Sequence, residues 1–249
     1  MRQPCEIQFP TEVTMLPFLM LQETDLEQQR AQSFFYKEPE TLAWIKSFAD
    51  GDTFWDVGAN VGIYSLYCAV LHPQSKIHAF EPHRGNFAHL RENITLNGFS
   101  NIIPHNCAIL DHHATELFYE PPRDEIGASG GQAEHPLTDT SAYYPVWVTT
   151  LDDLVDPFGV PTHVKIDIDG QELRVVRGML GLLMHPLLRS VLIEIEHGQP
   201  EVRAEIYASF LPLGFTTDNL FNRMPNHSRV RRAKEGIRVE NVIFTRGTV

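Results

Sequence analysis

The feature that most constrains this 249-residue chain is the segment Thr53-Phe-Trp-Asp-Val-Gly-Ala-Asn-Val-Gly62. Its first half is rich in apolar residues that favour a buried β-strand. Gly58, Asn60 and Gly62 then permit the left-handed backbone angles of a tight turn, which most side chains resist. From Val61 to Leu71 apolar residues recur at helical spacing. The segment therefore predicts a strand, a glycine-rich turn and a helix whose unpaired N–H groups point toward a bound molecule.

The spacing of this turn argues against a dinucleotide site. A Gly-x-Gly-x-x-Gly pattern would indicate a bound pyrophosphate, but Asn60 and Ile63 occupy two of the positions that the pattern needs. Asp56 would repel a phosphate and would favour a cationic ligand. The turn is therefore predicted to hold a cofactor that carries an amine and no phosphate, and S-adenosylmethionine has this chemistry. A turn that serves packing alone is the alternative when this motif is taken by itself.

A second acid supports a nucleoside cofactor. The predicted strand Lys76–Phe80 ends at Glu81, about 20 residues beyond the glycines, where acids hydrogen-bond ribose hydroxyls in nucleoside-binding α/β folds. Pro82 is expected to begin the next helix, at the position that proline prefers. The residues predicted from these two motifs to bind the cofactor are Asp56, Gly58, Asn60, Gly62, Glu81 and Pro82.

Four segments resemble the motif series of the FkbM family of S-adenosylmethionine-dependent methyltransferases. In chain order they are Asp56-Val-Gly-Ala-Asn-Val-Gly62, Phe80-Glu-Pro82, Cys107-Ala-Ile-Leu-Asp111 and Val164-Lys-Ile-Asp-Ile-Asp-Gly-Gln-Glu172. The resemblance covers about Phe34 to Val249, and it implies a Rossmann-like class I methyltransferase fold of the α/β class. This fold has a doubly wound, mostly parallel sheet with an antiparallel C-terminal strand. The resemblance also adds Ala108 and Asp167 to the cofactor site, and the chain departs from the family by carrying Asp169 where Glu is usual.

Charged residues at the ends of two later strands are the catalytic candidates. By the period-two rule, Lys165, Asp167 and Asp169 are expected to share one side of the first strand. Glu194 and Glu196 are expected to share one side of the second, just before His197. The predicted catalytic residues are Asp167, His197 and Lys165. His197 has an ordinary pKa near 6.5, which suits a base that accepts a hydroxyl proton, whereas Asp167 is a substrate-orienting or basic group.

Two other readings of these residues stay open. His197 is alternatively a loop histidine, and the acids are alternatively helix caps. Asp167, Glu194 and Glu196 also have the oxygen ligands that a divalent cation prefers, although we favour a site without metal. The residues predicted to bind the substrate are Asp169, Glu194, Glu196, Arg223 and Tyr143.

Composition narrows the function classes. The net charge of −12 disfavours a nucleic-acid partner, because phosphate binding depends on Lys and Arg. Three widely spaced cysteines indicate a reducing compartment, and no apolar run has membrane-spanning length, so a cytoplasmic protein without a membrane partner is expected. A homodimer is compatible with the sequence. The basic residues between Arg223 and Arg238 are either a solvated loop or a surface that steers an anionic substrate.

The chain is expected to comprise an N-terminal extension, residues 1–33, and one methyltransferase domain, residues 34–249. The Pro- and Gly-rich stretch 121–145 is predicted to be a lid or substrate loop, with a plain insertion as the alternative. Helices are expected over Glu38–Phe48 and residues 171–184, and strands over Ile102–Ile109, Thr115–Glu120, Val146–Thr150 and Val239–Thr245.

The predicted function is an S-adenosylmethionine-dependent O-methyltransferase that acts on a hydroxyl group of a small molecule. The resemblance implies sugars, glycosides and natural products as acceptor classes. N-methylation, a non-catalytic cofactor-binding module and a nucleotide-binding oxidoreductase are the alternatives.

Overall fold

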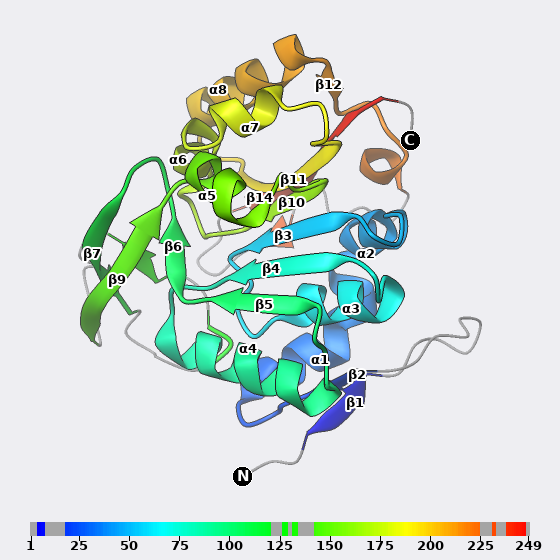
Figure 1. Cartoon of the computed structure of the whole chain (residues 1–249), viewed down its shortest axis with the longest axis vertical. Helices are drawn as coiled ribbons and strands as arrows, with labels where there is room; N and C mark the ends of the chain where they lie inside the picture. Colours follow the sequence, from blue (N-terminus) through cyan, green and yellow to red (C-terminus); the bar gives the residue numbers. More distant parts are fainter. Residues whose placement is uncertain are drawn as a thin grey trace.

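The centre of the protein is an α/β sheet. The computed structural model describes residues 4–7, 18–120, 126–128, 131–133, 142–224, 231–232 and 238–247. Within these ranges the main sheet has the strand order β12-β14-β11-β10-β3-β4-β5, and β13 pairs with β14 (Figure 1). Its strands are β3 (Thr53–Val57), β4 (Lys76–Phe80), β5 (Ile102–His105), β10 (His163–Ile166), β11 (Ser190–Glu196), β12 (Phe215–Thr216), β13 (Arg231–Arg232) and β14 (Arg238–Arg246).

The direction of the strands confirms the predicted doubly wound fold. Strands β11, β10, β3, β4 and β5 run parallel to one another, whereas β14 is antiparallel to β11. From β3 the chain builds outward through β4 and β5, and it later returns to place β10 on the other side of β3. The strand order therefore reverses between β3 and β10. In open α/β sheets ligands bind outside the carboxyl ends of the strands at such a point.

Helices cover both faces of the main sheet (Figure 1). On one face lie α1 (Asp25–Lys37), α2 (Pro39–Lys46), α3 (Ile63–Leu71) and α4 (Arg84–Asn97). On the other lie α5 (Leu151–Phe158), α6 (Glu172–Arg177), α7 (Leu180–Met184) and α8 (Pro200–Phe210). Short 3₁₀ helices span Leu211–Leu213 and Phe221–Arg223.

Alternate residues of the strands feed two separate hydrophobic cores. Phe54 packs into the core beneath α2 and α3, whereas its neighbours Trp55 and Val57 pack into the core beneath α6 and α8. A strand that is buried on both faces is apolar on both, as a central parallel strand requires. Asp56 is the exception in β3, because it is a carboxylic acid with 0% exposure.

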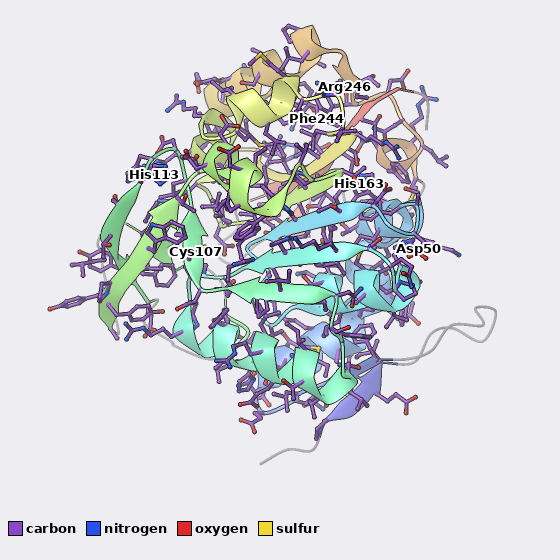
Figure 2. All side chains as sticks on the ribbon, viewed as in Figure 1. Asp50, Cys107, His113, His163, Phe244 and Arg246 are labelled. Carbon is purple, nitrogen blue, oxygen red and sulfur yellow. The ribbon has the colours of Figure 1, made fainter. Side chains whose placement is uncertain are left out.

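A second, smaller sheet branches from the first. It has the order β6-β9-β7-β8 and consists of β6 (Cys107–Ile109), β7 (Ala114–Tyr119), β8 (Gln132–Ala133) and β9 (Tyr143–Thr149). The single strand expected over Ile102–Ile109 is therefore wrong, because β5 and β6 belong to different sheets. The side chain of Asn106 donates hydrogen bonds to the carbonyls of Glu81 and Pro82 at 2.9 and 3.1 Å, and there the chain leaves the main sheet. Cys107 lies at this junction (Figure 2).

Two helix boundaries differ from the sequence prediction. Helix α4 begins at Arg84 and not at Pro82, because the His83 ring accepts the N–H of Asn86 at 3.0 Å and so caps the helix. Residues 171–184 form two helices. The carbonyl of Gly178 accepts the N–H of Asp152 at 3.1 Å, and the Asp152 carboxylate accepts the N–H groups at the start of α7.

The N-terminal residues pack against the helices of one face. Strands β1 (Cys5–Ile7) and β2 (Phe18–Met20) form an antiparallel pair, and the boundary expected after residue 33 falls inside α1. The Phe34 ring lies 5.7 Å from that of Phe18 and 5.3 Å from that of Tyr67 on α3. All three cysteines are free thiols. Among the described helices, each is too short or too polar to cross a lipid bilayer.

Replacement of Gly58 by alanine tests the close contact that brings β3 and β10 together. Gly58 has a φ of +79°, and a Cβ there would lie 1.9 Å from the carbonyl oxygen of Asp167. Gly51 is a matched control, since its φ is +96° and no described atom lies within 4 Å of its Cβ position. We expect Gly51→Ala to lower the free energy of unfolding by about 1–2 kcal/mol for the left-handed backbone alone. Gly58→Ala should cost about 1–3 kcal/mol more for overpacking. Urea denaturation measures both, and equal losses would contradict the contact.

Candidate active site

A pocket lies at the carboxyl ends of β3, β4 and β6, where the fold predicts a ligand. Gly58, Pro82 and Ala108 line it, and each comes from a different one of the predicted cofactor motifs. Ile168 and Gln171 close it from the loop after β10. The structure therefore brings residues that are up to 114 positions apart in sequence to one pocket, with Val57 and Gln171 at the two extremes.

The glycine-rich turn is held by the neighbouring strand. The N–H groups of Gly58 and Ala59 both donate to the carbonyl of Phe80 at 3.0 Å. Asn60 has a φ of +54°, as predicted for a turn residue that tolerates left-handed angles. Its N–H donates to Glu81 at 2.7 Å, and its side-chain amide donates to the carbonyl of Ala128 at 2.9 Å. Asn60 thus connects the turn to Glu81 and to Ala128.

Glu81 joins the first two motifs. Its Oε2 accepts the N–H of Asn60, and its Oε1 accepts the N–H of His83 at 2.9 Å. The side chain is buried, and burial raises the pKa of Glu81 to about 7. A carboxylate oxygen can accept more than one hydrogen bond, so the acid retains acceptor capacity beyond these two.

Asp56 lies beneath the turn, fully buried in β3. Its Oδ2 accepts a hydrogen bond from the hydroxyl of Ser65 at 2.6 Å, whereas its Oδ1 has no hydrogen-bond partner among the described residues. Burial raises the pKa of Asp56, against the opposing effects of the Lys165 ammonium and the Ser65 hydroxyl. The cation that the structure places beside Asp56 is thus Lys165, which is its partner in the β3–β10 ladder.

Lys165 and Asp167 form an ion pair at the end of β10. The Lys165 ammonium is 1% exposed and lies 2.7 Å from Oδ2 of Asp167, whose side chain is 26% exposed. Burial alone would lower the pKa of Lys165, but Asp167, Asp56 and Glu38 outweigh it and hold that pKa above its ordinary value. Burial alone would raise the pKa of Asp167, but Lys165 outweighs it and holds that pKa below its ordinary value. Both groups are therefore charged, so Lys165 keeps its proton and Asp167 is a weak proton acceptor.

The loop after β10 is organised by Glu172, which the sequence offered only as one of several acids that could hold a cation. Strand β10 ends at Ile166, so the expected alternation does not extend to Asp169, which has a φ of +58°. Oε1 of Glu172 accepts the N–H groups of Ile168 at 3.2 Å and Gly170 at 3.0 Å. Burial raises the pKa of Glu172 to about 7. The signal for this role was an acid two residues after Gly170, at the first position of a helix.

His197 is directed away from this ion pair. Its Nε2 lies 3.2 Å from Oε2 of Glu240, which also binds Arg203 on α8 at 2.9 Å. Glu240 pairs with Ile195 of β11, so it lies on the α8 face, whereas Lys165 faces the Tyr64 ring of α3 at 5.0 Å. The structure thus brings together Asp56, Lys165 and Asp167, and it places the partner of His197 on the opposite face.

The predicted substrate residues lie at several places. Glu194 is opposite Asn241 in the β11–β14 ladder, and Glu196 accepts a hydrogen bond from Gln199 at 2.8 Å. Arg223 is 64% exposed and pairs with Asp218. Most of the predicted lid and of the basic segment, apart from 126–128, 131–133, 142–145, 223–224, 231–232 and 238, falls outside the described residues.

Tyr143 and its neighbour point in opposite directions. Tyr143 is 65% exposed on the outer face of the second sheet. Tyr144 is buried, and its hydroxyl accepts the N–H of Arg84 at 2.9 Å. Tyr144 thus links β9 to the start of α4, beside the pocket residue Pro82.

The described residues contain no group of three or more His, Cys, Asp or Glu side chains that is arranged to hold a metal ion. Asp167, Glu194 and Glu196 are all described, so they do not form such a group.

The fold is that of a Rossmann-like class I methyltransferase, and the pocket lies at its switch point. The family model described as "Methyltransferase FkbM domain" matches residues 56–231, which is more than half of the 249 residues. The chain belongs to the FkbM methyltransferase family.

Similar proteins are methyltransferases by name. Hexuronic acid methyltransferase AglP of Haloferax volcanii is 30% identical over 156 residues, which cover 62% of this chain and 60% of that protein. 31-O-demethyl-FK506 methyltransferase FkbM of Streptomyces tacrolimicus is 28% identical over 217 residues, which cover 75% of this chain and 82% of that protein. Among solved structures, precorrin-6y C5,15-methyltransferase from Geobacter metallireducens is 12% identical with a TM-score of 0.48, over 92% of this chain and 94% of that chain. The match thus spans less than two thirds of the length of AglP.

The raised pKa of Glu172 predicts a pH-dependent stability difference. The folded protein keeps a proton on this acid between pH 4.5, its ordinary pKa, and about pH 7, whereas the unfolded chain releases it. The stabilisation from this proton is complete below pH 4.5 and is lost as the pH rises to about 7. Glu172→Gln keeps one oxygen for both N–H groups and removes the titration. Its free energy of unfolding, relative to wild type, should therefore rise between pH 5 and pH 8, by about 1.4 kcal/mol per pKa unit.

Glu81→Gln is the contrasting variant. Both oxygens of Glu81 accept separate backbone N–H groups, so an amide nitrogen must face one of those donors. We expect a loss of about 1–3 kcal/mol at low pH, the usual cost of an unsatisfied buried group. This loss should shrink as the pH rises to about 7, because the pKa of Glu81 is raised as well and the wild type loses the stabilisation from that proton. Denaturant titrations at several pH values measure both variants. Parallel pH profiles for Glu172→Gln and wild type would show that Glu172 does not titrate in this range.

Proposed function

We propose that the protein transfers a methyl group from S-adenosylmethionine to a hydroxyl group of a small molecule, with sugars, glycosides and natural products as acceptor classes. The observation that carries this proposal is the pocket at the ends of β3, β4 and β6, which joins Gly58, Pro82 and Ala108. The names of two relatives, a hexuronic acid methyltransferase and a 31-O-demethyl-FK506 methyltransferase, support an oxygen acceptor. Turnover distinguishes this function from a non-catalytic binding module, and the methylated atom distinguishes it from N-methylation.

The residues of the site fit this cofactor. The pocket is lined by apolar side chains such as Phe80 and Ile109, which suit a purine ring, and the buried carboxylate of Glu81 retains acceptor capacity for ribose hydroxyls. Asp56 provides a buried acid with an unpartnered oxygen below the turn. When bound, S-adenosylmethionine supplies an electrophilic methyl group on a positively charged sulfur. The acids Asp56 and Asp167 favour that charge.

Two residues are proposed to act on the acceptor hydroxyl. Asp167 is charged and partly exposed, so it can accept a hydrogen bond from the hydroxyl and orient it. Taking the proton would break its ion pair with Lys165, which favours an orienting role. His197 is the competing base, and its Nε2 lies 3.2 Å from Oε2 of Glu240.

Titration with S-adenosylhomocysteine tests the cofactor site. The ligand should raise the melting temperature of the wild type, because a ligand that binds only the folded state stabilises it. Asp56→Asn keeps the side-chain shape and should weaken binding by about 1–3 kcal/mol, the range for a charged hydrogen bond. Asp50→Asn is the control, since Asp50 is exposed before the amino end of β3 and, among the described residues, accepts only the N–H of Gln74. Wild-type protein that binds NAD but not S-adenosylhomocysteine would overturn the cofactor proposal.

Turnover tests the base. Candidate acceptors are screened by mass spectrometry for the gain of one methyl group. If His197 is the base, His197→Ala should lower kcat by about 10²–10⁴-fold without a change in cofactor affinity. EDTA should then have no effect on turnover. His113→Ala is the control, because His113 forms a similar exposed pair with Asp153 at 2.6 Å. A variant without His197 that keeps wild-type turnover in EDTA would leave Asp167 and positioning as the source of catalysis. Loss of turnover in EDTA that Mg²⁺ restores would instead require a metal.

A further inference from the structure

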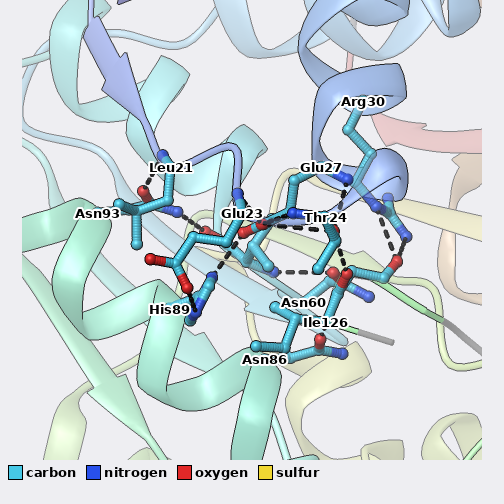
Figure 3. A network of polar contacts seen from close by, with 12 residues as sticks. Leu21, Glu23, Thr24, Glu27, Arg30, Asn60, Asn86, His89, Asn93 and Ile126 are labelled. Carbon is cyan, nitrogen blue, oxygen red and sulfur yellow. Dashed lines mark hydrogen bonds and ion pairs between the residues drawn. The ribbon is translucent and has the colours of Figure 1, made fainter. Parts of the chain in front are cut away.

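Hydrogen bonds hold backbone groups of three residues in the stretch 121–145. The carbonyl of Ile126 accepts the hydroxyl of Thr24 at 2.8 Å. The N–H of Gly127 donates to Oδ1 of Asn86 at 2.7 Å, and the carbonyl of Gly127 accepts Nε and Nη2 of Arg30 at 3.0 and 2.7 Å. We call Ile126–Ala128 the anchor segment. Figure 3 shows that its contacts come from α1 and α4, which are far from it in sequence.

The anchor segment reaches the glycine-rich turn through one carbonyl. The carbonyl of Ala128 accepts the side-chain amides of Asn60 at 2.9 Å and Asn86 at 3.1 Å. Ala128 is buried, so these hydrogen bonds are shielded from water. Asn60 is fixed at its other end by the bond from its N–H to Glu81. The left-handed angle of Asn60 therefore depends on partners on both sides, of which one is the anchor segment.

Helix α1 is itself locked onto α4. Thr24 caps α1, and Oε2 of Glu27 accepts a hydrogen bond from the N–H of Thr24 at 3.1 Å. The second oxygen of Glu27, which is 0% exposed, lies 2.6 Å from Nδ1 of His89 on α4. Thr24 and Arg30 thus contact the anchor segment from a helix that is hydrogen-bonded to α4. This network lies outside the pocket, because none of its members on α1 or α4 lines it.

We propose that Arg30, Thr24 and Asn86 are positioning residues for the glycine-rich turn. They act on Asn60 through the anchor segment. Arg30 supplies the central contact, since its guanidinium gives two hydrogen bonds to a single carbonyl. Without it, the carbonyl of Ala128 loses its fixed place, and the side-chain NH₂ group of Asn60 loses its acceptor, while Oδ1 of Asn60 keeps the N–H of Val61. The part of this inference that concerns the cofactor rests on the proposed function, whereas the structural coupling between Arg30 and Asn60 does not.

Hydrogen exchange tests the coupling without any ligand. Arg30→Met keeps the apolar stem of the side chain and removes its donors, and Arg30→Lys keeps one donor. Arg177→Met is the matched control, since Arg177 forms an exposed pair with Glu205 on the opposite face. We expect faster exchange of the amides of residues 58–62 in Arg30→Met, an intermediate rate in Arg30→Lys, and the wild-type rate in Arg177→Met. Exchange that changes near residues 126–128 but not at 58–62 would overturn the proposal.

Calorimetric titration with S-adenosylhomocysteine tests the consequence for the cofactor. Arg30→Met should bind about three- to tenfold more weakly than wild type, the change that one lost hydrogen bond makes, with partial recovery in Arg30→Lys. Thermal unfolding checks that both variants are folded. If Arg30→Met is not folded, the affinity of Arg30→Lys alone decides the test. Equal affinity of wild type and the Arg30 variants would refute the role in cofactor binding. Failure of the wild type to bind would refute the proposed function instead, and the exchange rates would still decide the coupling.

Discussion

A lysine ammonium buried inside the main sheet is the constraint around which the site is arranged. Moving a charge out of water costs several kcal/mol unless other charges and hydrogen bonds replace the water. Lys165 is compensated by Asp167 after its own strand, by Asp56 on β3 and by Glu38 before α2. Glu38 is in turn bound by the side-chain amide of Asn241 on β14 at 3.1 Å. One buried charge therefore ties together three strands of the sheet and the start of a helix, at the edge where the pocket opens.

Two other buried acids hold the loops of the site by accepting hydrogen bonds from backbone N–H groups. Glu81 accepts N–H groups from the turn after β3 and from the segment after β4, and Glu172 accepts two from the loop after β10. Each acid holds a loop that no regular ladder of hydrogen bonds can hold. The cost of burying them appears as their raised pKa values. The loops beside the pocket are thus held by hydrogen bonds within the protein, as in a preorganised binding site.

The sequence predicted the local structure around the glycine-rich turn well. The strand Lys76–Phe80 has the predicted bounds, and Asn60 takes the predicted left-handed angle, because apolar alternation and turn chemistry act within a few residues. The antiparallel last strand and the meeting of Gly58, Pro82 and Ala108 were implied by the motif series and are present. The strand over Ile102–Ile109 was wrong, since the break at Asn106 depends on the distant carbonyls of Glu81 and Pro82. Apolar periodicity carries no information about such partners.

What the sequence determined by itself is the order of the elements, the family and the chemical types of the groups at the strand ends. Tertiary structure alone decided how those groups are paired. Asp167, as an orienting or basic group, and His197, as a competing base, were both candidates from the sequence, but the sheet directs one toward Lys165 and the other toward Glu240 on the opposite face. The anchor at Arg30 and Gly127 joins residues 97 positions apart, through a side chain and a carbonyl that no local pattern marks. The physical reason is common to both, because the partners of a polar group are its neighbours in space, and these lie far away in the sequence.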